Sequence, residues 1–379
     1  MYHDRIRYHQ RRLDLGTGLF SDPNSNDRSE MQIGTFDIAT QDLIRHVGRI
    51  EQVADVRLLE FADGSGRGAR VLDFRTSMGL RFDVLVDRGF DIGRCDFRGV
   101  SIAWQSAVGT SAPWFAESDG LGWLRTFGGG LMTTCGFEHT LFPASGEGSR
   151  FAYPARDSVT YGLHGRISNR PARLSGYGIA SVEGREILWA EGVVEQAAVY
   201  GEALRLTRRI EVHADGSQIS VIDRVSNFGY ASTPTMVLYH LNLGFPLVAD
   251  GAQVLMDVAE ARDGTGAAPP EDYLTIPPPS HLSPEEGYEH QLVGHEDGWV
   301  SSSLINERLG VGFRECHDPS TLPYTFLWRS LRDGMYVVGL EPCSVPIEGR
   351  DAAIDAGVPL ELAPGESREY KLVLEPFAL

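Results

Sequence analysis

Short runs rich in Val, Leu, Ile and Phe, separated by glycine-containing turns, recur through most of this chain of 379 residues. Residues 53–104 hold several such runs, at a spacing of roughly 8 to 12 residues that is typical of β-sandwiches and barrels. The same pattern of short apolar runs and turns recurs at residues 203–229 and from Trp299 onward. Within it, HADGSQ at 213–218 has the Asp-Gly chemistry of a hairpin turn. We therefore expect an all-β fold, a large antiparallel sandwich with few short helices.

The N-terminal part of the chain differs from the rest, because its first 35 residues are polar and SDPNSNDRSE is typical of a solvated loop. We predict a polar N-terminal extension over residues 1–35 and one β-sandwich domain over residues 36–379. A short helical piece is expected within residues 35–49. Residues 263–287, rich in Pro and Gly, are expected to form an irregular surface excursion.

Charge and cysteine usage exclude several classes of protein. The formal net charge of -18 argues against nucleic acid or an anionic membrane as a partner, because both would be repelled. The four cysteines are far apart and form no CxxC pair, so neither a zinc cluster nor a disulfide framework is indicated. The N-terminus lacks the apolar core of a secretory signal, and no run approaches the length of a membrane span. We expect a cytoplasmic protein with reduced thiols and a small-molecule partner.

The strand LYHLNLGF, at 238–245, carries a histidine in an otherwise apolar run. Strand alternation puts Tyr239 and Leu241 on a core face, and His240 and Asn242 on the opposite face. That second face is neither fully apolar nor simply solvated, which fits the floor of a cleft. The alternative is a structural histidine that is hydrogen-bonded inside the sandwich.

The segment TYGLHGRISNRPA, at 160–172, places His164, Arg166 and Ser168 on one face of an extended chain. The glycines beside His164 leave room for something to approach the backbone. This space suits a ligand site and equally suits a tight crossing of two strands.

The segment MYVVGLEPCSVP, at 335–346, ends an apolar strand with the carboxylate of Glu341. Glutamate is rarely buried without a partner, because desolvation of its charge is unfavourable and raises its pKa. Glu341 could cap the strand end or pair with Arg350. Alternatively, a histidine and a carboxylate provide the two groups needed to move protons near neutral pH.

Several well-known catalytic motifs are missing from the sequence. It has no nucleophile elbow, no P-loop, no GxGxxG before a helix and no HExxH, so serine, phosphoryl-transfer, dinucleotide and zincin chemistry lack their signals. FGGGLMTTCG, at 127–136, lacks the GK[ST] ending of a phosphate loop. We interpret it as a tight glycine-rich passage near the cleft.

Taken in order, these segments resemble the galactose mutarotase (aldose 1-epimerase) superfamily. GLHGRISNRPA is similar to the superfamily's LHG segment, LYHLNLGF to its histidine-bearing strand, and VVGLEPCSVP to its glutamate-bearing strand. LELAPGESREYKLVLE resembles the closing strand pair, and VLVDRGFDI resembles a divergent bacterial aldose 1-epimerase-like branch. The resemblance covers about residues 55–379 and implies a β-supersandwich.

The resemblance also implies roles for particular residues. Glu341 matches the general base that takes the proton of the anomeric hydroxyl, and His240 matches the general acid that protonates the ring oxygen. His164 matches a histidine that hydrogen-bonds near that oxygen. We expect His240 and Glu341 to converge on one groove, and this chemistry requires neither a cofactor nor a metal.

Further residues are candidates for sugar contacts. Glu289, with His290 beside it, occupies a stretch that resembles the superfamily's sugar-binding acidic segment. Arg88 could bind the sugar or form a turn pair with Asp87, and Arg166 could bind a hydroxyl, a carboxylate or a phosphate. The candidate substrate-binding residues are Arg88, Arg166, Glu289, His290 and Asn242. The tryptophans that could stack on a sugar are Trp104, Trp114, Trp123 and Trp328.

Two other functions remain open at this point. The same His and Glu could abstract a proton next to a carbonyl, giving an isomerase or lyase that acts on an oxidised sugar. The chain could also be a non-catalytic carbohydrate-binding module. If a metal were bound, its plausible ligands would be His164, His240, Glu289, His290 and Glu341. The sequence leaves open the identity of the sugar and the oligomeric state, which includes a homodimer.

Overall fold

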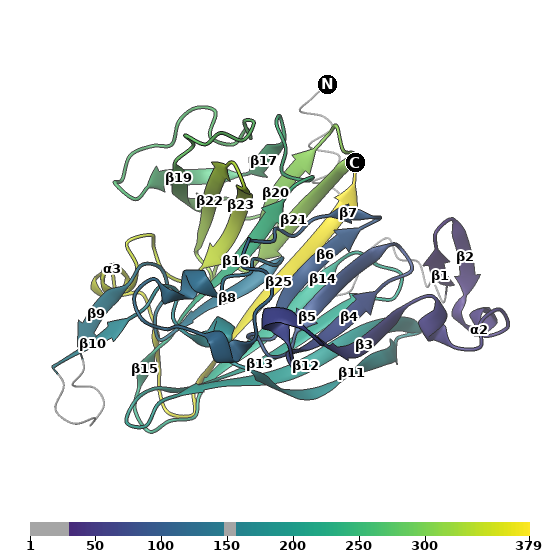
Figure 1. Cartoon of the computed structure of the whole chain (residues 1–379), viewed down its shortest axis with the longest axis horizontal. Coiled ribbons are helices and arrows are strands. Elements are labelled where there is room, and N and C mark those ends of the chain that lie inside the picture. Colours follow the sequence, from purple (N-terminus) through teal and green to yellow (C-terminus); the bar gives the residue numbers. More distant parts are fainter. Residues whose placement is uncertain (1–29, 148–156) are drawn as a thin grey trace.

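The computed structural model describes residues 30–147 and 157–379. Most of the predicted N-terminal extension, residues 1–35, therefore lies outside the described residues. Within the described ranges, two large antiparallel sheets of eight and eleven strands hold most of the strand residues (Figure 1). This arrangement confirms the predicted all-β sandwich.

The first sheet places the most C-terminal described strand, β25, in its interior, between β14 and β21. Its strands, in spatial order, are β11 (Ala172–Val182), β12 (Arg185–Ala197), β13 (Ala203–His213), β14 (Ile219–Asn227), β25 (Ser367–Ala378), β21 (Val311–His317), β20 (Val300–Asn306) and β17 (Gln253–Met256).

The second sheet carries the segments that the sequence singled out. Its strands, in spatial order, are β18 (Val258–Asp263), β19 (Glu285–Leu292), β22 (Tyr324–Arg332), β23 (Met335–Cys343), β16 (Met236–Gly244), β8 (Met132–Phe137), β6 (Asp91–Phe97), β5 (Leu80–Leu85), β4 (Arg70–Arg75) and β3 (Asp55–Glu60), with β7 (Val100–Ser101) paired to β6. Strand β16 thus lies between β23, which follows it by about ninety residues, and β8, which precedes it.

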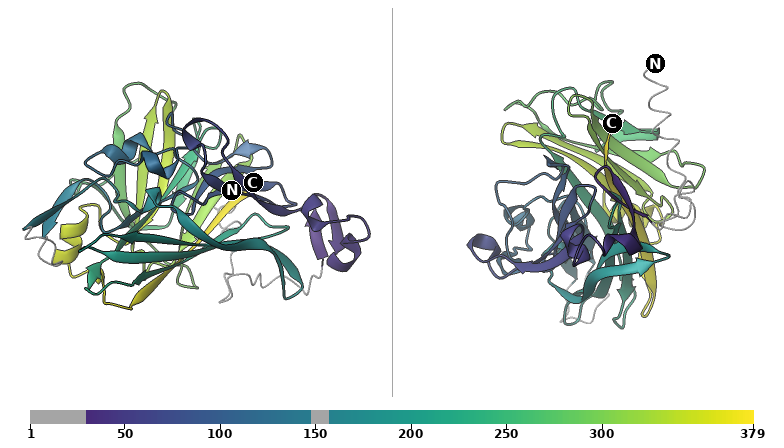
Figure 2. Two further views of the ribbon diagram at one scale, coloured as in Figure 1. Left: turned by 60° about the horizontal axis from the view of Figure 1, so that its bottom comes forward. Right: turned by 90° about the vertical axis from the view of Figure 1, so that its right-hand side faces the viewer.

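Smaller elements complete the described part of the chain. Three two-stranded sheets pair β1 (Glu30–Ile33) with β2 (Phe36–Ala39), β9 (Ala144–Glu147) with β10 (Ser158–Tyr161), and β15 (Thr233–Pro234) with β24 (Glu361–Leu362). The helical pieces are α2 (Thr40–Leu43), α3 (Arg350–Asp355), η1 (Ile50–Gln52), η2 (Gly64–Gly66), η3 (Pro113–Phe115), η4 (Gly122–Arg125) and η5 (Ile167–Asn169). The β1–β2 hairpin and α2 project from the body of the molecule (Figure 2). None of the described helices is long and apolar enough to cross a membrane.

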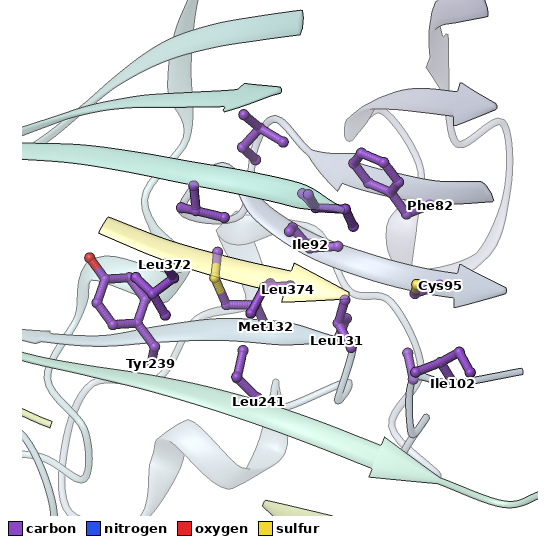
Figure 3. Packing of buried hydrophobic residues seen from close by; sticks show 14 of the residues in the cluster. Phe82, Ile92, Cys95, Ile102, Leu131, Met132, Tyr239, Leu241, Leu372 and Leu374 are labelled. Carbon is purple, nitrogen blue, oxygen red and sulfur yellow. The ribbon is translucent and has the colours of Figure 1, made fainter. Parts of the chain in front are cut away.

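The main hydrophobic core lies between the two large sheets. Figure 3 shows Leu372 and Leu374 of β25 packed near Met132 of β8 and near Tyr239 and Leu241 of β16. Alternation along the strands selects these residues, since every second side chain points inward. The predicted core face of β16 is therefore confirmed for Tyr239 and Leu241.

A charged cluster is buried within this core. The guanidinium of Arg208, on β13, is fully buried and lies 2.7 Å from Asp91 Oδ1 and 2.6 Å from Asp223 Oδ2. The hydroxyl of Tyr239 donates a hydrogen bond of 2.7 Å to Asp223. Since removing one partner leaves a buried charge uncompensated, this cluster ties β13, β14, β6 and β16 together.

The outer face of the second sheet is covered where β16 lies. All nine residues of β16 are buried, so the face that carries His240 is drier than the sequence pattern suggested. Its cover is a second hydrophobic cluster that includes Trp104, Trp123 and Phe127 from the long connection between β7 and β8. That connection is distant in sequence from β16, which is why local alternation could not predict the cover.

Candidate active site

The register of two neighbouring strands brings His240 and Glu341 side by side. Leu241 of β16 pairs with Leu340 of β23, and Leu238 pairs with Cys343, so His240 lies across from Glu341. The distance from His240 Nδ1 to Glu341 Oε1 is 3.2 Å, and each residue is only 4% exposed. The two groups are thus adjacent on one face of the sheet rather than opposed across a groove.

His164 reaches the same place from a separate loop. Its ring lies 5.6 Å from the His240 ring, edge to face at 81°, and 4.7 Å from the Trp123 ring. The loop crosses β8 closely, because Gly165 has φ +68° and a Cβ there would collide with the carbonyl oxygens of Gly136 and His139. The glycine beside His164 therefore makes the tight chain crossing and, in doing so, places the imidazole in the site.

Several buried polar atoms converge here without hydrogen-bond partners among the described residues. They are His164 Nδ1, His240 Nδ1, Glu341 Oε1 and Asn242 Oδ1. The His240–Glu341 pair is close enough for an ion pair, yet its angles do not form a hydrogen bond. Because an unsatisfied buried polar group is unfavourable by about 1–3 kcal/mol, such a group calls for an explanation, and a ligand supplies one.

Burial shifts the protonation of all three groups toward the uncharged form. Desolvation lowers the pKa of His240 to about 4 and lowers the pKa of His164 well below its usual value. Desolvation, aided by the nearby charge of Glu285, raises the pKa of Glu341 well above its usual value. Near neutral pH, His240 is therefore uncharged, and burial favours the protonated form of Glu341.

Aromatic rings surround the His240 imidazole. Phe127 lies 5.2 Å from it, Trp328 lies 5.1 Å from it at 74°, and Trp123 lies 6.2 Å from it, measured between ring centroids. Trp104 contacts both Phe127 and Trp328, at 5.7 Å and 6.4 Å. Three of the four predicted tryptophans thus gather at the site. Trp114 does not share these contacts; it is 61% exposed and lies beside Gly68.

The site is nearly closed in this structure. A cavity of about 40 Å³ lies beside the site and is lined by Arg88, Phe127 and Thr133, the last of which pairs with His240 in register, but His164, His240 and Glu341 do not line it. A wider surface hollow of about 760 Å³ lies elsewhere, along β3 and Tyr177, and contains none of the predicted site residues. The candidate active site is therefore the buried region around His240, where the proton-transfer groups gather, and not the shallow, open hollow. A ligand can reach the buried groups only if the covering side chains move.

Arg88 is held by the backbone. Its guanidinium donates to the carbonyl oxygens of Ser168, Ser111 and Thr126 at 3.1, 2.8 and 2.9 Å. Its pKa is lowered to about 10 by burial. The predicted turn pair with Asp87 is not formed, because Asp87 binds Arg70 instead, at 2.5 Å. Arg88 therefore fixes three loops and has little donor capacity left for a sugar.

Arg166 is also engaged, by Glu138 at 2.7 Å and by Glu202. Its two carboxylate partners already compensate its charge, so it does not offer a free cation to a carboxylate or phosphate on a ligand. Neither partner could be identified from the sequence, because each lies about thirty residues from Arg166, Glu138 just after β8 and Glu202 just before β13.

Glu289 and His290 lie on β19 with protein partners of their own. Glu289 accepts hydrogen bonds from Arg262 at 2.9 Å and from the amide of Ile347 at 2.6 Å. His290 contacts the Tyr273 hydroxyl at 3.0 Å and the carbonyl of Thr325 at 3.2 Å. Phe326 separates Glu289 from Glu341 in the strand register. Within the described ranges, no group of three or more His, Cys, Asp or Glu is arranged to hold a metal ion, so the five residues named as alternative ligands are not assembled.

Two contributors to the site were not predicted from the sequence. Phe127 precedes the glycine-rich run and packs on His240. Gly339 lies beneath the Glu341 carboxylate, where a Cβ would collide with that carboxylate. Gly339 could have been recognised because it lies two residues before Glu341 in the same strand. Residues at this spacing face the same side of the sheet, so a glycine there leaves room for the carboxylate.

Comparison with known proteins agrees with this fold. The family described as a domain of unknown function (DUF4432) matches residues 66–375, and no curated protein matches the chain. A candidate aldose 1-epimerase from Klebsiella pneumoniae superposes with a TM-score of 0.75 at 21% identity, covering 85% of this chain and 83% of that one. A galactose mutarotase-like protein from Clostridium acetobutylicum gives 0.61 at 14% identity, covering 86% and 99%. Galactose 1-epimerase from Lactobacillus acidophilus gives 0.55 at 12% identity, covering 86% and 99%. At these identities, the likeness shows a galactose mutarotase-like fold, as the sequence resemblance predicted.

Proposed function

The chain belongs to the family described as domain of unknown function DUF4432, and we propose that this member is an enzyme that interconverts the α and β anomers of an aldose. Its fold is that of the galactose mutarotase-like proteins, but a fold hosts many activities, so the proposal depends on the site.

One observation carries the proposal: a nitrogen of a buried imidazole and an oxygen of a buried carboxyl group, His240 Nδ1 and Glu341 Oε1, lie 3.2 Å apart, and neither atom satisfies hydrogen-bond geometry with any described residue. Anomer interconversion needs one group that removes the proton of the anomeric hydroxyl and one that delivers a proton to the ring oxygen. These two oxygens are bonded to the same carbon, so two adjacent proton-transfer groups can serve both.

The reaction is balanced without an added reactant. Glu341, as carboxylate, takes the proton of the anomeric hydroxyl while His240, as imidazolium, gives a proton to the ring oxygen. The bond between C1 and the ring oxygen breaks, and the anomeric oxygen becomes the carbonyl oxygen of the open chain. After rotation about C1–C2, attack by the former ring oxygen and return of both protons give the other anomer.

The directions of the two pKa shifts support this scheme. A neutral imidazole beside a protonated carboxyl group holds the same number of protons as an imidazolium beside a carboxylate. Burial favours the first arrangement in the empty site, as the directions of the two pKa shifts indicate. A bound hemiacetal, which donates at one oxygen and accepts at the other, stabilises the second. His164, whose low pKa keeps it neutral, hydrogen-bonds to the sugar without adding charge.

Exchange NMR on the anomers of a panel of aldoses tests this proposal. Faster exchange between α and β signals supports it, new product signals would indicate an isomerase or lyase, and bound but unchanged sugar would indicate a non-catalytic module.

Substitutions then test the two roles. His240→Asn and Glu341→Gln should each lower kcat/KM by about 10²-fold or more while the protein stays folded. Matched controls are His281→Asn and Glu307→Gln, which make the same chemical changes at exposed positions. Full activity in both site variants would show that the roles are assigned wrongly.

A further inference from the structure

We propose that Glu285 is a positioning residue for the His240–Glu341 pair, acting through the indole of Trp328. This inference rests on the proposed function, because it adds a residue to that same site. Glu285 lies at the start of β19, four residues before Glu289, and the sequence resemblance assigns it no role in the reaction.

The strands on both sides of Trp328 leave room for its indole. Trp328 pairs in register with Gly287 of β19 on one side and with Gly339 of β23 on the other. A Cβ at Gly287 would meet nothing within 4 Å, so open space lies beside the ring on that side. Neither glycine has a side chain that could hold the indole, so its orientation depends on contacts with other residues.

Glu285 supplies that contact. It lies two residues before Gly287 on β19, diagonally across from Trp328, within reach of a long side chain. The indole N–H donates to Glu285 Oε1 at 2.8 Å, a hydrogen bond to a charged acceptor and therefore one of the stronger kind. Trp328 is partly buried and packs on His240 and Trp104, so this bond fixes the edge of the indole that those two rings do not hold.

Away from Glu285, the Trp328 side chain packs against the residues of the reacting pair. The Trp328 ring lies 5.1 Å from the His240 ring at 74° and 6.4 Å from the Trp104 ring at 70°. Its Cβ also borders Gly339, the residue beneath the Glu341 carboxylate. A change in the orientation of this ring therefore changes the packing around both members of the pair. Glu285 has a second, weaker influence, since its charge adds to the rise in the Glu341 pKa.

Three substitutions separate position from charge. Glu285→Ala removes both the hydrogen bond and the charge, Glu285→Gln keeps an acceptor for the indole without the charge, and Trp328→Phe keeps an aromatic ring without the N–H donor. We expect Glu285→Ala to lower kcat at saturating aldose about tenfold, with a smaller change in KM, and Glu285→Gln to recover most of that loss. The Glu285→Ala/Trp328→Phe double variant should be no slower than Trp328→Phe alone, because both changes break one contact. Glu307→Ala is the matched control for loss of an exposed carboxylate.

A second measurement does not depend on turnover. Because the Trp328 ring lies 5.1 Å from the His240 ring, its ring current should shift the His240 ring-proton resonance, which Glu285→Ala should move and Glu285→Gln should not. Wild-type protein without activity on any aldose overturns the proposed function, and the resonance then decides the role of Glu285 alone. An unmoved resonance, equal effects of Ala and Gln at position 285, or additive losses in the double variant would each overturn the positioning role.

Discussion

Substitution of Gly339 by alanine tests whether the floor of the site is shaped to hold the Glu341 carboxylate. A Cβ at this position would come closer than 3.0 Å to Glu341 Oε1, and to within 3.2 Å of Glu341 Cδ and of Trp328 Cβ. The strand backbone and the base of Trp328 cannot easily move, since both belong to the middle of the sheet. The carboxyl group must therefore shift by about 1 Å to restore ordinary contact.

The size of the effect follows from that displacement. A reacting group misplaced by about 1 Å can slow a reaction roughly 10²-fold, which corresponds to about 2.7 kcal/mol in the activation barrier. Overpacking of a tight site also lowers the free energy of unfolding, by about 1–3 kcal/mol. We therefore expect Gly339→Ala to fold but to lose about 99% of kcat/KM.

Gly287→Ala is the matched control, because it makes the same change on the other side of Trp328, where an added Cβ meets nothing within 4 Å. This variant should keep its activity. Its free energy of unfolding should rise by up to about 1 kcal/mol, because alanine has less conformational freedom than glycine in the unfolded chain. Anomer-exchange NMR gives the rates and urea denaturation gives the stabilities. Equal activities of the two alanine variants would refute the argument that Gly339 makes room for the carboxylate.

Two further predictions concern protonation and stability. The rate of anomer exchange should fall at acidic pH with an apparent pKa near 4, because burial lowers the His240 pKa to about 4. Below that pH the pair takes up a second proton and loses its base. A rate that already falls near pH 6.5 would contradict this. On the alkaline side, the rate should fall only at a pH well above 4.5, because burial raises the pKa of Glu341 and the pair keeps its proton until Glu341 ionises. Arg208→Met should lower the free energy of unfolding by about 3–5 kcal/mol in urea denaturation, because it leaves Asp91 and Asp223 buried together without their cation. The exposed Arg224→Met should change it by about 0.5 kcal/mol or less, and similar losses at both positions would count against the buried cluster.

The parts of the site that sequence analysis could predict are those set by local rules. Alternation along one strand puts Tyr239 in the core and His240 on the other face, and both positions are as expected. Glu341 was recognised because a carboxylate is unusual in an apolar strand. Their proximity, however, depends on the pairing of strands about ninety residues apart, and a resemblance to known proteins was needed to anticipate it.

The remaining substrate-binding candidates show where local rules fail. Arg88 and Arg166 were judged by their charge and their neighbours in sequence, yet their hydrogen bonds are made with segments distant in the chain. Glu289 likewise has Arg262 as a partner on the adjoining strand. Whether an arginine is free for a ligand depends on such distant partners. Patterning along one strand does not contain that information, and neither does it reveal the loop that covers His240.

The position of β25 has a consequence for biosynthesis. Because this strand lies between β14 and β21, the eight-stranded sheet stays divided into two halves until residues 367–378 have left the ribosome. Until then, β14 and β21 each present an open hydrogen-bonding edge beside apolar side chains, which is the kind of surface that draws unfinished chains into aggregates. The nascent protein should therefore depend on chaperones late in translation, and proteins cut short before β25 should accumulate as insoluble material.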